Sequence, residues 1–345
     1  MLATRTLRHR MLVAGGATLA VAALLTGCTQ GTTTDVGPTN NTDNEGTGET
    51  IVIGFSGPAA DHGWLGAINS AAIAEAAKYP DIDLKVAEGT NDPNLQISQV
   101  EGFINDGVDA IVLLPTDGAA LTDVAIKAME AGIPVINVDR EFSSTFAARV
   151  TILGDNYGMG VSAGTYICEQ LGDNPDAVVA EIAGIDSLPL TQARSEGFAK
   201  ALDDCGLEVS NRVAADFTVA GGEAVTSQLL SAAPKIDAIW NHDDDQGLGV
   251  LAAIAAADRD EFFLVGGAGS ANAMREIEAG TGVLQATVIY PSTQAADGIR
   301  LARLIVQDKA LSDLVEIEVP SRIVLNAPVV TADNVEQYLP SAFES

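Results

Sequence analysis

Residues 107–117 read GVDAIVLLPTD, and this stretch decides the fold class of the chain. Its centre, Ile111-Val112-Leu113-Leu114, is apolar at every position. Successive side chains of a strand point to opposite faces of a sheet, so an unbroken apolar run must be buried on both faces. A strand of this kind is typical of a parallel sheet that helices cover on both sides.

Similar short apolar runs alternate with amphipathic stretches from Thr50 onward. They predict two sets of five strands each. The first set comprises residues 51–55, 84–87, 110–114, 135–138 and 150–153. The second set comprises residues 177–182, 208–214, 238–240, 262–265 and 284–289.

The stretches between these strands have helical periodicity. Asp92 is a predicted N-cap and Pro93 fits the first turn of the following helix, which has one apolar face. That face comprises Ile97, Val100 and Ile104, and a second stripe comprises Leu121, Val124, Ala128 and Met129. Strand–helix alternation that occurs twice predicts an α/β protein with two doubly wound parallel-sheet lobes.

The N-terminal segment has the order of an export signal. Arg5, Arg8 and Arg10 precede an apolar run over residues 11–25, and Gly27 and Cys28 follow it. This ending resembles a bacterial lipobox, which implies cleavage before Cys28 and a diacylglycerol on its sulfur. We therefore expect residues 1–27 to be a lipoprotein signal peptide and the protein to be anchored to the outside of the cell membrane.

Residues 28–49 have almost no side chains to bury and predict a disordered tether between the lipid and the globular part. Cleavage before Cys28 leaves 318 of the 345 residues, enough for two domains of ordinary size. Loss of the three signal arginines lowers the net charge from −29 to −32. So acidic a surface repels nucleic acid and anionic lipid, which argues against a nucleic-acid partner.

Two cysteines, Cys168 and Cys205, remain beside the lipidated one. Each falls late in a predicted helix of the same half of the chain, in a compartment that favours disulfides. The residues alone leave two interpretations open, a disulfide or two partly buried thiols.

Six motifs occur in a characteristic order. They are GVDAIVLLPTD (107–117), IPVINVDR (133–140), GDN (154–156), ARSEGF (193–198), ADF (215–217) and HDDDQGLGVLAAI (242–254). From Thr50 to the C-terminus the chain resembles the type I periplasmic sugar-binding proteins, the ribose- and galactofuranose-binding group that serves ABC importers.

The resemblance implies two lobes that close by a hinge around a ligand, with three chain crossings. We expect the crossings near Leu153-Gly154, Tyr290-Pro291 and Val319-Pro320. The N-terminal lobe would then hold residues 50–153 and 291–320, and the C-terminal lobe residues 154–290 and 321–345. Ligand would lie at the carboxyl ends of the strands.

The first loop, GPAADHGWLG (57–66), contributes several candidate ligand-binding residues. By resemblance Trp64 stacks on the apolar face of a sugar ring; the alternative is ordinary packing of the helix on the sheet. Asp61 and His62 could bond to sugar hydroxyls or instead cap the helix. Asn91, just before the Asp92 cap, has the same two interpretations.

Asp139 and Arg140 end a buried strand, where charge is costly without a partner. By resemblance the carboxylate accepts from sugar hydroxyls and the guanidinium donates to sugar oxygens; the alternative is a structural ion pair. Arg194 matches the family's ligand-binding arginine of the second lobe. Phe217 matches an aromatic side chain that closes over the ligand.

The acidic run 242–245 suggests a metal site only superficially, because the alternate acids, central glycine and distal glutamate of a calcium loop are absent. Asp243 stands where the family usually has a sugar-binding Asn, and it offers acceptors to hydroxyl donors. We expect Asp244 and Asp245 to cap the next helix.

Two departures from the family concern the ligand. Ribose-binding relatives have Phe-Asp where this chain has Gly267-Ala268, which removes one grip on the sugar and leaves space for a ligand larger than a plain pentose. Tyr290 stands where relatives often have Gln, and we include it among the candidate ligand-binding residues.

The sequence thus favours a monomeric solute-binding lipoprotein that delivers a sugar, sugar derivative or polyol to an ABC permease. A second interpretation is a sensor that presents its closed form to a signalling receptor. An exported hydrolase is disfavoured because there is no G-x-S-x-G elbow or credible triad. We expect no enzymatic activity, no cofactor and no metal.

Overall fold

The computed structural model describes residues 46–172, 174–309 and 318–345. The predicted signal peptide, the predicted lipidation site Cys28 and most of the predicted tether lie outside this range. Within the described part of the chain, no helix is long and apolar enough to cross a membrane.

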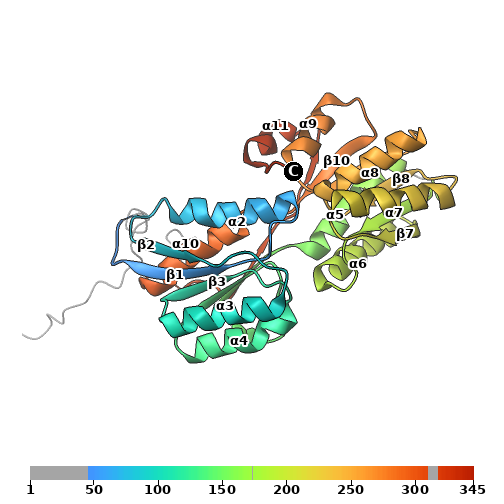
Figure 1. Ribbon diagram of the computed structural model, residues 1–345. Coiled ribbons are helices and arrows are strands. Elements are labelled where there is room, and N and C mark those ends of the chain that lie inside the picture. The colour runs from blue at the N-terminus through green and yellow to red at the C-terminus, as the bar shows by residue number, and fades with distance from the viewer. Residues whose placement is uncertain (1–45, 173, 310–317) are drawn as a thin grey trace, which may run out of the picture.

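Two six-stranded sheets form the framework (Figure 1). The first has the order β11-β5-β4-β3-β1-β2 and is parallel throughout. Its strands are β1 (Ile51–Ser56), β2 (Ile82–Val86), β3 (Ala110–Leu113), β4 (Val135–Val138), β5 (Val150–Gly154) and β11 (Arg322–Leu325). Residues 111–114, the run that defined the fold class, are completely buried.

The second sheet has the order β12-β10-β9-β8-β6-β7, with only β12 antiparallel among its described strands. Its strands are β6 (Val179–Ala183), β7 (Val209–Ala214), β8 (Ala238–Asn241), β9 (Phe263–Ala268), β10 (Leu284–Ile289) and β12 (Val329–Thr331). All ten predicted strands are present, with ends that shift by up to three residues.

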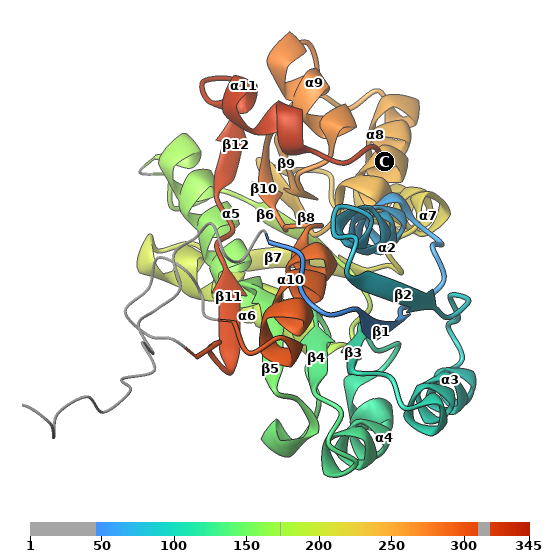
Figure 2. The same cartoon turned by 90° about the vertical axis from the view of Figure 1, so that its left-hand side faces the viewer.

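Helices cover both sheets (Figure 2). The first lobe has α2 (Gly63–Ala76), α3 (Pro93–Asp106), α4 (Gly118–Glu130), α10 (Gln294–Val306) and the short η1 (Thr145–Ala147). The second lobe has α5 (Asn156–Leu171), α6 (Pro189–Asp204), α7 (Val219–Ala232), α8 (Asp244–Ala257), α9 (Ala271–Ala279), α11 (Val335–Tyr338) and η2 (Leu339–Ser341). Asp92 caps α3 by accepting from the backbone N–H of Asn94, and Pro93 is its first residue, as predicted.

The chain passes between the lobes three times. It leaves the first lobe after Gly154 and returns at Tyr290-Pro291, because α10 packs on β3, β4 and β5. The third crossing, predicted near Val319-Pro320, lies instead between β11 and β12. The prediction was wrong because β11 pairs with residues 151–154 and so extends the first sheet. Residues 321–325 therefore belong to the N-terminal lobe.

The end of the predicted tether is part of the first lobe. The backbone N–H of Gly48 donates to Asp81 (2.7 Å), and Arg303 donates to the carbonyl oxygen of Gly46 (2.6 Å). The side chain of Gln307 donates to the carbonyl oxygen of Glu49 (3.0 Å). For residues 46–49 the prediction of disorder was wrong, because composition does not reveal backbone groups that a folded lobe binds.

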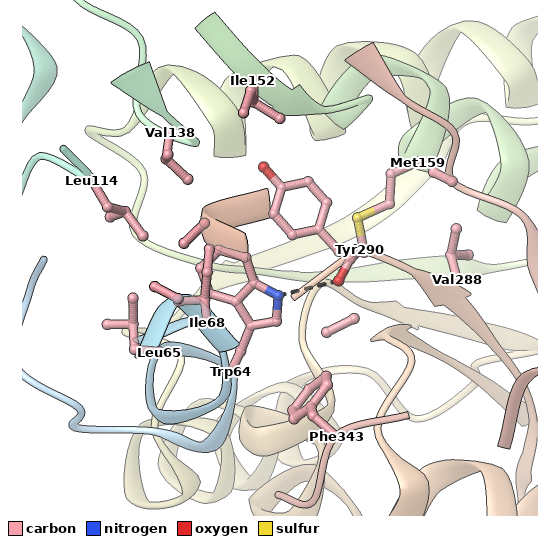
Figure 3. Close-up of a cluster of buried hydrophobic side chains, with 14 of the residues drawn as sticks. Trp64, Leu65, Ile68, Leu114, Val138, Ile152, Met159, Val288, Tyr290 and Phe343 are labelled. Carbon is pink, nitrogen blue, oxygen red and sulfur yellow. Dashed lines mark hydrogen bonds between the residues drawn. The ribbon is translucent and has the colours of Figure 1, made fainter. Parts of the chain in front are cut away.

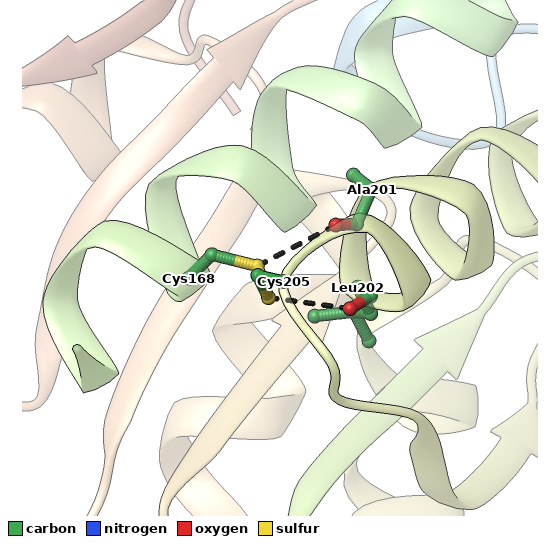
Figure 4. Close-up of a disulfide and its surroundings, with 4 residues drawn as sticks. All are labelled: Cys168, Ala201, Leu202 and Cys205. Atoms are coloured by element: carbon green, nitrogen blue, oxygen red, sulfur yellow. Dashed lines mark hydrogen bonds between the residues drawn. A yellow bond between two sulfur atoms is a disulfide. The ribbon is translucent and has the colours of Figure 1, made fainter. Parts of the chain in front are cut away.

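A disulfide joins Cys168, near the end of α5, to Cys205, the C-cap of α6, with their Cα atoms 6.2 Å apart (Figure 4). The two helices lie against each other closely enough that a Cβ at Gly164 would lie 2.7 Å from the Cβ of Ala201. The covalent link therefore closes a helix pair within one lobe and leaves the hinge unconstrained.

Candidate functional site

The carboxyl ends of the parallel strands of both sheets point toward the junction of the lobes (Figure 1). Loops that follow β1 and β4 approach this junction from the first lobe. The ends of β8 and β10 and the helix α6 approach it from the second. Most of the predicted ligand-binding residues lie on these segments.

Asp139 and Tyr290 connect the two lobes directly. Asp139 follows β4, has a left-handed backbone (φ 64°) and is buried. The phenol of Tyr290 donates to Oδ1 of Asp139 at 2.5 Å. Burial and the neighbouring charge of Asp139 raise the pKa of Tyr290 far above its usual range, so the phenol stays protonated and donates.

In the described part of the chain, the guanidinium of Arg140 is hydrogen-bonded through Nη1 and not through Nε. Its Nη1 donates to the carbonyl oxygen of Thr116 at 2.8 Å, while its buried Nε has no hydrogen-bond partner among the described residues. That Nε lies 3.9 Å from Oδ2 of Asp139, too far for a hydrogen bond. The pair is therefore a loose one, with a donor and an acceptor still available.

Arg194 is the buried cation of the second lobe. Its Nε donates to Asn156 (2.9 Å) and its Nη1 to the carbonyl oxygen of His242 (3.1 Å). The guanidinium lies 4.5 Å from the ring centroid of Tyr290 and 5.9 Å from that of Phe217. Cation–π contact at these distances stabilises a charge that has lost its water.

Phe217 reaches toward the first lobe. Its backbone is left-handed (φ 66°), and its ring occupies the space where any side chain at Gly184 would lie. The ring stacks against that of His62 with centroids 6.2 Å apart. His62 in turn bonds Asp61 (2.6 Å), to which Asn91 donates (2.9 Å).

The cap interpretation of the first loop was wrong for Asp61 and His62. His62 is the N-cap residue of α2 but makes no side-chain capping bond, and the carboxylate of Asp61 is engaged by His62 and Asn91. Their polar atoms therefore form a small network at the edge of the junction.

Trp64 is buried among apolar side chains of both lobes (Figure 3). Its indole N–H donates to the carbonyl oxygen of Tyr290 (3.1 Å), and the two rings lie 5.4 Å apart. This arrangement is the packing alternative stated above. Stacking of a sugar on the indole stays a prediction.

The three acids of the run 243–245 point to three different sets of donors. Asp243 caps α8 by accepting from the backbone N–H groups of Asp245 (2.9 Å) and Gln246 (3.2 Å). Asp244 accepts from three backbone N–H groups of the loop 267–270 and from the hydroxyl of Thr287. Asp245 accepts from the backbone N–H of Trp64 in the other lobe (2.9 Å).

The prediction that Asp244 and Asp245 cap α8 was therefore wrong, because the helix begins at Asp244 and places Asp243 at the N-cap. Burial raises the pKa of Asp243 to about 7, and the nearby charge of Asp245 acts in the same direction. Burial also raises the pKa of Asp244 to about 7, against the bonds it accepts.

A Cβ at Gly267 would lie 2.5 Å from the carbonyl oxygen of His242 and 2.7 Å from Cε of Met159. The backbone and Met159 thus fill the volume that a larger side chain at Gly267 would occupy. Space for a larger ligand stays a prediction.

Two residues of this network were not singled out from the sequence. Asn156 accepts from Arg194 and donates to the phenol of Tyr290 (3.1 Å), so it orients both. His242 is fully buried and bonds Glu181 (2.9 Å). Asn156 could have been found from the GDN motif, whereas the Glu181–His242 pair joins strands whose neighbourhood the sequence does not reveal.

Two α/β lobes, three chain crossings and opposed polar side chains at the junction define a hinged two-lobed binding protein. The sequence profile of the periplasmic binding protein domain family matches residues 53–310, and the chain belongs to this family. The family is one of substrate-binding proteins that act outside the cytoplasm.

Relatives and solved structures agree with this assignment. The ribose import binding protein of Bacillus subtilis (strain 168) is 30% identical over 74% of this chain and 84% of its own length. The galactofuranose-binding protein of Escherichia coli (strain K12) is 29% identical over 60% of this chain and 66% of its own. An ABC transporter solute-binding protein from Bacillus halodurans C-125, solved with bound myo-inositol, is 26% identical with a TM-score of 0.75, and the match covers 86% of this chain and 99% of that one.

Proposed function

We propose that this protein is the solute-binding lipoprotein of an ABC importer and captures a sugar, sugar derivative or polyol between its lobes. The observation that carries the proposal is the convergence of Asp139, Arg140 and Arg194 at the junction, linked through Tyr290 and Asn156. The related proteins named for ribose and galactofuranose, and the structure with myo-inositol, support a polyhydroxylated ligand.

The free groups at the junction suit hydroxyl groups of both polarities. The buried Nε of Arg140 has no hydrogen-bond partner among the described residues and can donate to a hydroxyl, while the carboxylate of Asp139, whose Oδ1 accepts from Tyr290, can accept from one. A hydrogen bond to a charged group contributes about 1.5–3 kcal/mol. No step of bond making or breaking is required, so the proposal includes no enzymatic activity and no cofactor.

A thermal-shift screen of pentoses, hexoses, polyols and inositols tests the proposal, because a tight ligand raises the melting temperature by mass action. Asp139→Ala and Arg140→Ala should each abolish the shift that the best ligand produces. Arg149→Ala is the matched control. Arg149 lies at the amino ends of the strands of the same sheet, opposite the junction, and bonds the carbonyl oxygen of Val319. A full shift in both site variants would overturn the proposed site.

The lipid anchor is part of the same proposal and rests on the sequence around Cys28. Cleavage before Cys28 and acylation of its sulfur would hold the protein at the outer face of the cell membrane. Expression with an alkyne-tagged fatty acid should label the full chain and not the Cys28→Ser variant. Equal labelling of both would exclude this anchor.

A signalling role is a second candidate. The fructose-binding periplasmic domain of a hybrid two-component system is 27% identical to this chain with a TM-score of 0.73, over 84% of this chain and 93% of that one. Genes for a permease and an ATPase beside the gene of this protein would favour import, and a sensor kinase gene would favour signalling. A monomer in size-exclusion chromatography is expected in both cases.

A further inference from the structure

Helix α2 begins at the junction of the lobes without a cap of its own. His62 occupies the N-cap position, has an extended backbone (φ −146°, ψ 166°) and makes no side-chain capping bond. The first N–H groups of a helix have no partner within the helix, and a side-chain oxygen normally accepts from the second or third of them. This acceptor must therefore come from elsewhere.

The other lobe supplies it. Oδ2 of Asp245, on α8 of the second lobe, accepts from the backbone N–H of Trp64 at 2.9 Å. Trp64 is the second residue of α2, which is the position that an N-cap side chain serves. In its local geometry Asp245 therefore caps a helix that is 181 residues distant in sequence and belongs to the opposite lobe.

The electrostatics of this contact are favourable only when the lobes meet. Asp245 lies in the first turn of α8 and faces the N-terminus of α2, so its carboxylate lies between the positive ends of two helix dipoles. It is buried (3% exposed), and a buried charge is costly without such partners. Separation of the lobes would leave α8 alone to stabilise the carboxylate and would uncap α2.

Gly63 makes the close approach sterically possible. A Cβ at Gly63 would lie 2.5 Å from Oδ1 of Asp245 and 2.8 Å from Cα of Ser345, both in the second lobe. The residue has ordinary helical backbone, so its small size and not its flexibility is what the contact requires.

We propose that Asp245 is a positioning residue for ligand capture, because it caps α2 across the junction in the closed state and loses this bond when the lobes open. The link to capture rests on the proposed function, but the coupling of the cap to closure does not. Removal of an N-cap acceptor costs about 0.5–2 kcal/mol, which corresponds to a decrease of roughly 2- to 30-fold in the ratio of closed to open molecules.

The test compares three variants of the full protein without added ligand. Asp245→Ala should increase the radius of gyration in small-angle X-ray scattering and accelerate hydrogen exchange in the first turn of α2 by roughly 2- to 30-fold. Asp117→Ala is the matched control, because Asp117 caps α4 within the first lobe by accepting from Ala120 (2.9 Å). Asp117→Ala should lower the stability of the protein by a similar amount and change neither the radius of gyration nor the exchange rate in α2.

Gly63→Ala provides an independent variant. Alanine favours a helix more than glycine does, so the melting temperature should stay the same or rise while the radius of gyration increases. The proposal would be overturned if hydrogen exchange in α2 were as fast in the wild type as in Asp245→Ala. It would also be overturned if neither Asp245→Ala nor Gly63→Ala changed the radius of gyration. A protein that binds no sugar would contradict the proposed function and still show these changes.

Discussion

Tyr290 contacts side chains of both lobes at once. Its ring contacts the indole of Trp64 and the guanidinium of Arg194, and its phenol donates to Asp139. Through these contacts Tyr290 helps to fix the positions of the two charged residues beside it.

Tyr290→Phe keeps the ring and removes the hydrogen bond to Asp139. We expect the free energy of unfolding to fall by about 1–3 kcal/mol, because the buried carboxylate loses a donor. Denaturant titration measures this change. Tyr157→Phe, at an exposed tyrosine of α5, should leave the free energy within about 0.5 kcal/mol of wild type. Equal values for both variants would show that the phenol does not stabilise the fold.

His242 is a buried histidine that the proposed capture does not use directly. Its Nε2 bonds Glu181 (2.9 Å), and its Nδ1 accepts from the backbone N–H of Gly184 (3.4 Å), which requires a neutral ring. Burial lowers the pKa of His242 to about 4, although the contact with Glu181 acts in the opposite direction. The unfolded chain, with an ordinary histidine pKa of about 6.5, binds a proton first as the pH falls.

Acidification from about pH 6.5 to about pH 4 should therefore lower the free energy of unfolding by about 3 kcal/mol through this residue. Asp243 and Asp244, whose pKa values burial raises to about 7, act in the opposite sense over this range. The comparison of wild type with His242→Gln isolates the histidine. The difference in the free energy of unfolding between wild type and variant should change by about 3 kcal/mol over this pH range, and parallel curves would contradict the assignment.

At the scale of single residues, the sequence predicted which side chains are buried charges at strand ends better than it predicted their hydrogen-bond partners. Asp139 was predicted as a buried charge at a strand end, which a motif and local hydrophobicity suffice to indicate. Its partner Tyr290 lies 151 positions along the chain, and periodicity contains no information on such pairs. For the same reason Asp245, expected to cap its own helix, was not recognised as the cap of α2.

Among the secondary-structure elements, the ten strands of the two strand–helix repeats were predicted, including the edge strands β2 and β7, whereas β11 and β12 were not. The ten predicted strands are short apolar runs, and most are buried on both faces, which leaves a clear signal in the sequence. The strand β11 alternates exposed and half-buried residues at the edge of the first sheet, and β12 has only three residues. Both strands are short and lie outside the strand–helix alternation, so the sequence pattern predicted neither them nor the position of the third crossing.

The disulfide between α5 and α6 closes a loop with a sequence separation of 37. A cross-link of this span restricts the unfolded chain and is expected to contribute about 2–4 kcal/mol. The double variant Cys168→Ser, Cys205→Ser should show this loss in denaturant unfolding and retain ligand binding, because the link lies within one lobe. Reduction of the wild type should reproduce the loss, whereas equal stability of the reduced and oxidised protein would contradict a stabilising disulfide.

Over the whole molecule, the two lobes followed from the duplicated strand–helix pattern and the hinge from the family resemblance, but the relation of the tether to the lobes followed from neither. The strand β1 begins at the end of the first lobe remote from the second and runs toward the junction (Figure 1). Residues 46–49 are bound near that remote end, around Asp81 and Arg303. Attachment there leaves the junction and the hinge free to move.

Asp81 is the centre of this attachment. It is buried and accepts from Arg303 (2.8 Å), Gln307 (2.9 Å) and the backbone N–H of Gly48 (2.7 Å). Burial acts to raise its pKa, but these bonds outweigh it and hold the pKa well below the usual range. The ionised form therefore stabilises the folded state above the ordinary aspartate pKa of about 3.9, and this contribution is lost as the pH falls below that value.

Asp81→Asn removes the charge and leaves Arg303 without its buried carboxylate, which typically costs about 3–5 kcal/mol. We expect that loss in denaturant unfolding, together with faster cleavage after Glu49 by a glutamate-specific protease, because residues 46–49 lose a bond to the lobe. Ligand affinity should not change, since the attachment lies at the opposite end of the sheet from the junction. Asp109→Asn, which alters a partly exposed carboxylate that bonds the backbone of Val52, is the control and should leave cleavage after Glu49 unchanged. A large loss of affinity in Asp81→Asn would show that the tether and the hinge are coupled.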